Sequence, residues 1–254
     1  MNSWPTGAAV MSLVLAGVPA QATAAQCHIP AEHADMIFPT DRLIEPVIDR
    51  HGLSERMGPV QTPISLEFYD YLLDHLALMA VLMQRLGMGS FQFLPRGQDQ
   101  FWVDDGEGAQ GVLTLLYQDP GNRIYFIDGE HTSTLFPTVH AKTAVFMKLV
   151  PTVTSEGRPA VRMSLASYTS LESRLLNVFA RMFRLLVQRA VSRTLSRQFS
   201  LTNQLGLRIA QDPQRILQEV PSLPFSKPDD QQMFLSLLQA TIHPSPLHHP
   251  SFAP

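Results

Sequence analysis

The alternation of apolar and polar positions is clearest between Thr138 and Val150. The apolar positions that share one parity are Val139, Ala141, Val145, Met147 and Leu149, and the polar positions of the other parity are His140, Lys142 and Lys148. A period of two is typical of a strand with one face in water. The stretch "RPAVRMSLASYTS", which begins at Arg158, repeats the pattern and predicts a second such strand.

Short apolar runs separated by turn signals extend this pattern over residues 90–169. The turns read "PRGQ", "DDGEG", "DPGN" and "SEGRP". The strands they separate are predicted around residues 91–94, 100–104, 110–118, 123–130, 138–150 and 158–169. Because most of the connections are short, the chain is predicted to form a six-stranded antiparallel meander.

A different period precedes this region. Between Ser65 and Leu86, apolar residues recur at intervals of three and four, with Ser65 as a candidate cap and Gly87 as a stop signal. The pattern predicts one largely buried helix before the sheet. Residues 28–63 contain five prolines and predict a wrapping arm, with at most a short helix at Thr40–His51 capped by Thr40 or Asp41.

A long helix is predicted over residues 171–210, ending before Asp212 and Pro213. The apolar stripe of its first half is formed by Leu175, Phe179, Met182 and Leu186, flanked by Leu176, Phe183 and Val187. The stripe of its second half is Val191, Leu195, Thr202, Leu205 and Ile209, about 180° around the helix. We therefore expect either a bend near residues 188–193 or two packing partners. The first half would lie on the sheet, and the second would reach past its edge towards the amino-terminal arm or another surface.

The composition is compatible with a large core, at 45% hydrophobic and 16% charged residues. A net charge of −3 disfavours nucleic-acid binding. Residues 171–210 are an exception, with seven arginines and a single acid, Glu172. Arg189, Arg193 and Arg197 form one ridge, which is interpreted either as a contact for an anionic membrane or partner, or as internal ion pairs with acids such as Asp104, Asp105 or Glu107.

The two ends of the chain have their own signals. Residues 1–24 combine an apolar run at Ala8–Val18 with an A-x-A-like site, Ala22-Thr23-Ala24, which predicts a cleaved export signal and a periplasmic location if the source is bacterial. The alternative is an unstructured leader on a cytoplasmic protein. Residues 213–254 predict a short helix at Asp229–Thr241 and a Pro- and His-rich tail.

Two motifs bear on catalysis or cofactors. Gly106 to Gly111 fits G-x-G-x-x-G, which could indicate a nucleotide or S-adenosylmethionine fold of the methyltransferase type, but no alternation of strands and helices follows, so a hairpin turn is favoured. Asp128, Glu130 and His131 could serve acid–base chemistry or be an ordinary charged strand end. With one cysteine and no other catalytic motif, no metal or cofactor is predicted, and an enzyme is the less favoured interpretation.

The order of a helix, a six-stranded meander and a long carboxy-terminal helix over Ser65–Asp212 resembles the START-like, helix-grip superfamily. The resemblance implies an α+β fold in which the sheet grips the last helix around a lipid or another apolar molecule. It also implies ligand-facing roles for Leu115, Phe126, Val145, Met147 and Met163 of the sheet, and for Leu175, Phe179, Met182, Phe183 and Leu186 of the helix. The family usually has a strand before its first helices, for which Asp35–Phe38 is the only candidate.

Overall fold

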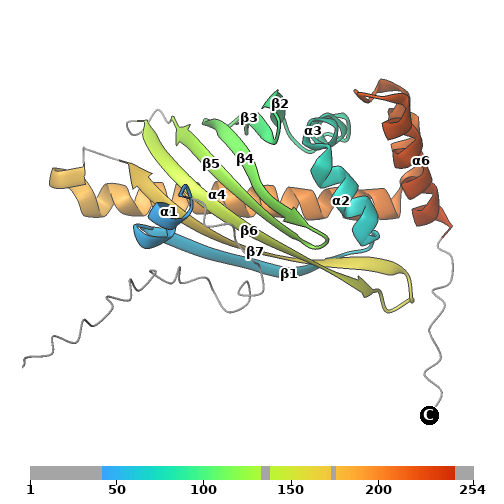
Figure 1. Cartoon of the computed structure of the whole chain (residues 1–254), viewed down its shortest axis with the longest axis horizontal. Coiled ribbons are helices and arrows are strands. Elements are labelled where there is room, and N and C mark those ends of the chain that lie inside the picture. Colours follow the sequence, from blue (N-terminus) through green and yellow to red (C-terminus); the bar gives the residue numbers. More distant parts are fainter. Residues whose placement is uncertain (1–41, 133–137, 173–175, 244–254) are drawn as a thin grey trace, which may run out of the picture.

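A computed structural model of the chain describes residues 42–132, 138–172 and 176–243, and the side chains of residues 172–191 lie outside this description. Its centre is one curved antiparallel sheet (Figure 1). The strands are β1 (Leu53–Thr62), β2 (Gln92–Gly97), β3 (Gln100–Asp104), β4 (Ala109–Asp119), β5 (Asn122–His131), β6 (Val139–Val153) and β7 (Pro159–Glu172), in the order β1-β7-β6-β5-β4-β3-β2. This layout confirms the predicted α+β helix-grip fold, with seven strands rather than six.

The additional strand, β1, lies in the segment that was predicted to be an arm. It pairs only with β7, so it forms an edge of the sheet, and its register shifts between Met57 and Val60. Gly58 and Pro59 fill that shift, and proline is tolerated at an edge strand or bulge because no ladder hydrogen bond is lost there. The interruption removes the alternation from the sequence, which explains why Asp35–Phe38, outside the described residues, was the only candidate.

The helix predicted between Ser65 and Leu86 is two helices, α2 (Leu66–Asp74) and α3 (Leu76–Arg85). Ser65 caps α2 as expected, accepting a hydrogen bond from the backbone N–H of Phe68 at 3.2 Å. The break falls at His75, whose backbone is not helical and whose Nδ1 lies 2.8 Å from the Tyr71 carbonyl oxygen. After α3, Gly87 adopts a φ of +69° and ends the helix at its predicted stop.

The predicted carboxy-terminal helix is α4 (Leu176–Gln211), one continuous helix that runs along the length of the sheet (Figure 1). Two side-chain hydrogen bonds join it to β1: Ser192 donates to Glu55, and Thr62 donates to Asn203. The expectation that its second half reaches past the sheet towards the amino-terminal segment is met only in part: α4 contacts β1 of that segment, but β1 is itself a strand of the sheet. Leu205 and Ile209 are fully buried in the apolar cluster that α2, α3 and α6 also form.

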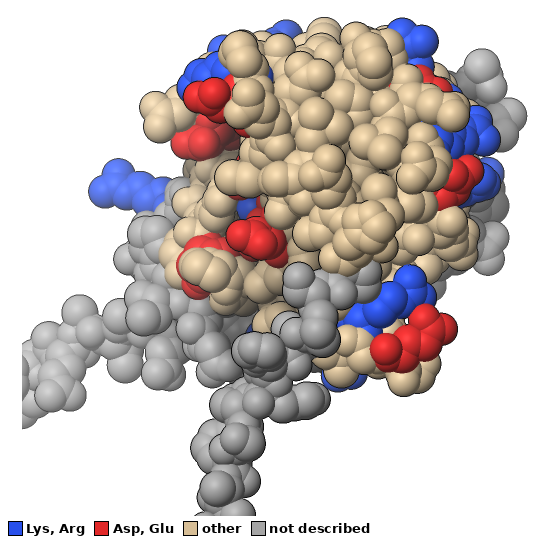
Figure 2. Space-filling model, turned by 90° about the vertical axis from the view of Figure 1, so that its right-hand side faces the viewer, with Lys and Arg blue, Asp and Glu red and all other residues tan. Residues whose placement is uncertain are grey.

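The chain after α4 folds back against the same core. It forms α5 (Pro213–Glu219), a short 3-10 helix (Val220–Ser222) and α6 (Pro228–Ile242), of which only α6 was predicted. Phe234 of α6 packs edge-on against Phe68 of α2, with ring centroids 5.4 Å apart. The end of the molecule where α6 lies shows few charged side chains (Figure 2). Residues 213–243 therefore contribute to the core, with Ile216, Val220, Leu223, Phe234, Leu237 and Leu238 all buried.

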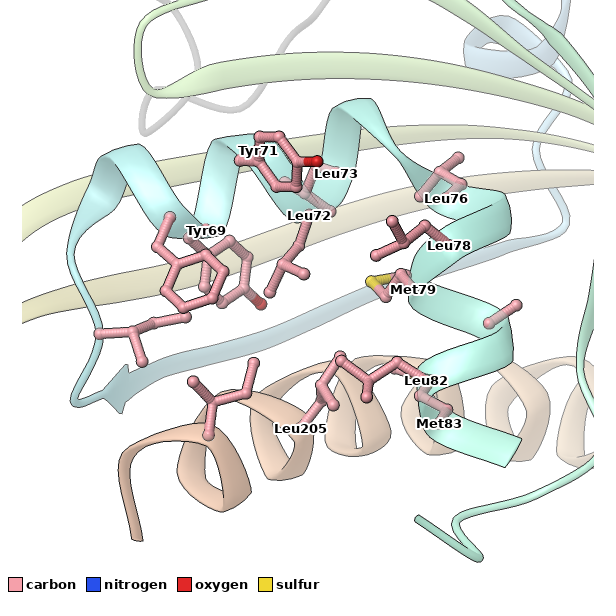
Figure 3. Close-up of a cluster of buried hydrophobic side chains, with 14 of the residues drawn as sticks. Tyr69, Tyr71, Leu72, Leu73, Leu76, Leu78, Met79, Leu82, Met83 and Leu205 are labelled. Carbon is pink, nitrogen blue, oxygen red and sulfur yellow. The ribbon is translucent and has the colours of Figure 1, made fainter. Parts of the chain in front are cut away.

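Each face of the sheet has its own apolar cluster. On the α4 side, α2 and α3 place their buried side chains over Leu205 (Figure 3). On the outer side, the short helix α1 (Glu45–Asp49) buries Val47 and Ile48 against Phe146 and Tyr168. The helix α1 falls inside the predicted Thr40–His51, while the proposed caps Thr40 and Asp41 lie outside the described residues.

Candidate functional site

A cavity of about 260 Å³ lies between the sheet, α3 and the second half of α4. Its helical lining from α2, α3 and α4 consists of Leu73, Leu76, Met79, Met83, Thr194, Leu195, Gln198, Phe199 and Thr202. Its apolar lining from the sheet and the segment leading into it includes Phe91, Phe93, Val103, Leu113, Tyr125, Ile127, Val145, Met147, Met163 and Leu165. Methionines and aromatic rings dominate these walls, and such side chains adapt to guests of irregular shape.

Three of the five strand residues predicted to face a ligand line this cavity: Val145, Met147 and Met163. Leu115 packs against the core cluster of the same face without lining the cavity, and Leu113, two residues earlier, lines it. Phe126 was placed on the wrong face, since it packs in the outer cluster with α1. Residues 124–127 are apolar at every position, so periodicity could not decide which of them face inward.

The helix residues of the prediction cannot be compared in the same way. The side chains of Leu175, Phe179, Met182, Phe183 and Leu186 lie outside the described residues. The described lining of α4 comes from the second half instead, and it includes Leu195 and Thr202 of the second predicted stripe. Two residues of the second predicted stripe, Leu195 and Thr202, therefore face the cavity beneath the sheet, whereas the sequence predicted that this half of the helix would extend beyond the sheet.

A charged cluster lies beside the cavity, under α2. Arg123 of β5 is 1% exposed, and its Nη1 and Nη2 lie 2.7 Å from Asp74 Oδ1 and 3.1 Å from Asp70 Oδ1. Burial raises the pKa of Asp70 above its ordinary value, in spite of the opposing effect of Arg123. With two carboxylates around one guanidinium, the cluster carries one formal negative charge.

Two buried phenols connect this cluster to the cavity. Tyr125 follows Arg123 by two residues on the same face of β5 and lines the cavity. Burial raises the pKa of the Tyr125 hydroxyl, and the nearby charge of Arg123 opposes that change. The hydroxyl of Tyr69, which projects from α2 toward α4 (Figure 3), lies 3.0 Å from the sulfur of Met163.

The arginines of the predicted ridge, Arg189, Arg193 and Arg197, do not share one environment. Arg197 forms an ion pair with Glu107, one of the acids considered as internal partners, and its guanidinium lies 5.5 Å from the ring centroid of Phe91. Arg193 is exposed, and the side chain of Arg189 is outside the described residues. Since Glu107 lies in the β3–β4 turn and Phe91 lines the cavity, Arg197 links α4 to the cavity wall.

Two of the three residues considered for catalysis lie at the cavity. Glu130 and His131 contribute to its lining, and Asp128 is exposed and does not. The carboxylate of Glu130 accepts a hydrogen bond from Gln110 at 2.7 Å and lies 3.5 Å from His140. Gly106 and Gly108 form the β3–β4 turn and Gly111 lies in β4, so the nucleotide-fold alternative is wrong and the hairpin interpretation is confirmed.

Within the described residues, no group of three His, Cys, Asp or Glu side chains could hold a metal ion. Among the described helices, none is both long and apolar enough to cross a membrane.

No family model matches the chain, and no curated protein matches it. Solved structures similar to the chain include a conserved protein from Geobacillus kaustophilus (11% identity, TM-score 0.43, 61% of this chain and 96% of that one). They also include a START superfamily protein from Mycobacterium smegmatis (13% identity, TM-score 0.40, 63% of this chain and 99% of that one). A third is Ara h 8.0201 (13% identity, TM-score 0.34, 61% of this chain and 96% of that one).

Proposed function

We propose that the protein is an exported, non-enzymatic binder or carrier of an apolar small molecule such as a lipid. The observation that supports this most directly is the cavity of about 260 Å³, whose walls are mostly aliphatic, aromatic and methionine side chains. At about 10–30 Å³ per water-sized group, depending on the measure of volume, such a cavity accommodates roughly ten to twenty non-hydrogen atoms. That is the size of a short amphiphile or a small ring system.

An acid–base enzyme of the same fold is less well supported. Its candidate carboxylates are Asp128, which is exposed, and Glu130, whose carboxylate is engaged by Gln110 and His140. Glu130 and His131 both contribute to the cavity lining, whereas Asp128 does not. A general acid–base site requires its groups to converge on one reacting atom, and the Glu130 carboxylate is already engaged by Gln110 and His140.

Filling the cavity tests the proposed function. Ala141 lines it from β6, so Ala141→Phe should place a ring in the space and weaken binding of an environment-sensitive apolar dye at least tenfold. Native mass spectrometry of the purified wild type should also detect a co-purifying apolar molecule. Val150→Phe is the matched control, because Val150 is 42% exposed on the opposite face of the same strand.

Two results would reject the proposal. One is a wild-type protein that binds no apolar dye and carries no molecule. The other is a dye that binds Ala141→Phe and Val150→Phe as tightly as it binds the wild type, since the dye would then sit on the outer surface.

The same proposal includes docking of the arginine ridge on an anionic membrane. Among the described residues of the ridge, Arg193 is the exposed one. Near an anionic bilayer a basic residue contributes about 1 kcal/mol. Arg193→Gln should therefore reduce co-sedimentation with anionic vesicles by about fivefold, whereas Arg197→Gln should mainly lower the melting temperature. Equal vesicle binding by Arg193→Gln and the wild type would rule out docking through this residue.

A further inference from the structure

The polar atoms under α2 form an incomplete hydrogen-bonding site at the wall of the cavity. Tyr125 is 5% exposed, and no described residue accepts a hydrogen bond from its hydroxyl. The guanidinium of Arg123, two residues earlier on the same face, can only donate to that oxygen, and it is paired with Asp70 and Asp74 and does not line the cavity. Tyr69 donates to the sulfur of Met163, which is a weak acceptor. Two phenol donors are thus poorly satisfied in a largely apolar core.

Such an arrangement is costly unless something accepts these hydrogen bonds. A buried donor without a partner typically costs about 1–3 kcal/mol, and most buried polar side-chain atoms in folded proteins are hydrogen-bonded. A phenylalanine at position 125 would fill nearly the same volume without this cost. Packing alone therefore does not account for a tyrosine rather than a phenylalanine at position 125. A ligand atom that accepts a hydrogen bond from its hydroxyl does.

The charge beside the site limits what that atom can be. Arg123 is already paired at 2.7 Å and 3.1 Å with two carboxylates, those of Asp74 and Asp70, so the cluster has a formal charge of −1. A ligand carboxylate or phosphate beside Tyr125 would be repelled by this negative charge, although solvent weakens the repulsion because Asp70 and Asp74 are 24% and 41% exposed. An uncharged oxygen can accept hydrogen bonds from the same donors without that repulsion.

We infer that the Tyr125 hydroxyl anchors an uncharged carbonyl or hydroxyl oxygen at one end of an otherwise apolar ligand. The inference rests on the proposed function and specifies its ligand class. Leu73, Leu76, Met147 and Leu165 line the same cavity and provide apolar contacts for the rest of the molecule. The ligand expected is a ketone, ester or alcohol rather than a fatty-acid anion.

Probes that differ only at the polar end test this class. The set is a methyl ketone, a primary alcohol and a carboxylate, each with an alkyl chain of about nine carbons to suit the cavity volume. Binding is measured by displacement of the apolar dye at pH 8, where the carboxylate is ionised. The ketone and the alcohol should displace the dye at concentrations at least tenfold below that of the carboxylate.

The Tyr125→Phe variant tests the anchor itself. A neutral hydrogen bond is worth about 0.5–1.5 kcal/mol, so the ketone and the alcohol should bind about two- to thirteenfold more weakly, while the affinity of the dye stays unchanged. Without ligand, the variant should melt at the same temperature as the wild type or higher, because a buried hydroxyl without a partner has been removed.

Tyr71→Phe is the matched control. Tyr71 lies on a different side of α2 from Tyr69 (Figure 3), and its hydroxyl donates to the Asp230 carbonyl oxygen at 2.8 Å. Its removal should leave binding of all three probes unchanged, although the protein should melt earlier.

The outcomes separate the two proposals. If Ala141→Phe abolishes binding but Tyr125→Phe binds the ketone and the alcohol like the wild type, the ligand binds in the cavity and the proposed role of Tyr125 is wrong. If the carboxylate binds more tightly than the ketone and the alcohol, the uncharged-oxygen class is wrong. If neither the dye nor any probe binds the wild type, the proposed function fails and this inference fails with it.

Discussion

Tyr125 and Phe126 are neighbours in the chain and almost equally buried, at 5% and 6% exposure, yet they belong to different faces of the sheet. Tyr125 lines the cavity, and Phe126 packs under α1. Both side chains were similar candidates in the sequence, because an apolar run buried on both faces has no period to follow. At the scale of the residue, one step along β5 decides between a ligand contact and a structural contact.

Gly206 of α4 shows how closely the helix approaches β1. A Cβ at this position would lie 2.1 Å from Thr62 Cγ2, within a region where both residues are fully buried. Overpacking costs about 1–3 kcal/mol, and the helix propensity of alanine returns about 1 kcal/mol. Gly206→Ala should therefore lower the free energy of unfolding by about 1–2 kcal/mol, as measured by urea denaturation.

A second variant makes this prediction specific to the contact. Thr62→Ser removes Cγ2 while keeping the hydroxyl that donates to Asn203, so the double variant should recover most of the loss caused by Gly206→Ala. Ser196→Ala, at an exposed position of α4, is the control for helix propensity alone. Additive effects of Thr62→Ser and Gly206→Ala would contradict a direct clash.

At the scale of the element, the six strands with regular patterns were predicted close to their observed bounds, and the elements with local irregularities were not. Gly58 and Pro59 hid β1, and nothing in the sequence around His75 signals the break between α2 and α3. Asp74 and His75 at the break have low helix propensity, which permits the interruption, but such residues also occur inside helices, so propensity alone did not predict it. Figure 3 shows α2 and α3 running in different directions above α4.

The packing of α6 on α2 leads to a second prediction. Phe234 is fully buried and contacts both Phe68 and Phe225, with ring centroids 5.4 Å and 5.7 Å away. Phe234→Ala should lower the free energy of unfolding by about 3–5 kcal/mol, because a cavity is left in the core. Met233→Ala, at a neighbouring position that is 52% exposed, should have little effect. A small loss in Phe234→Ala would show that α6 is dispensable for the core.

At the scale of the whole molecule, the arrangement that creates the cavity depends on segments distant in sequence. Its walls come from α2, α3, strands β2 to β7 and α4, so residues 73 to 202 must assemble before it exists. The roles of the α4 arginines also depend on the tertiary structure. Arg197 forms an ion pair with Glu107 of the β3–β4 turn, whereas Arg193 is exposed to solvent. One basic pattern therefore contains both an internal ion pair and an exposed charge.

Export is a whole-molecule property that the amino-terminal segment predicts. If the A-x-A-like site at Ala22-Thr23-Ala24 is cleaved, amino-terminal sequencing of the mature protein should begin near Ala25. A variant with Ala22 and Ala24 replaced by bulky residues should retain the leader. Functional protein that still begins at Met1 would show that the segment is not a cleaved signal.

The sequence alone determined the strand meander, the helical segment before it and the long basic helix, because these follow from local periodicity and turn chemistry. The tertiary structure decided which face each apolar strand residue takes, where β1 joins the sheet and which segments line the cavity. The pairing of Arg123 with Asp70 and Asp74 was also beyond the sequence. Burial and hydrogen bonding between distant segments set these features, and no local pattern records them.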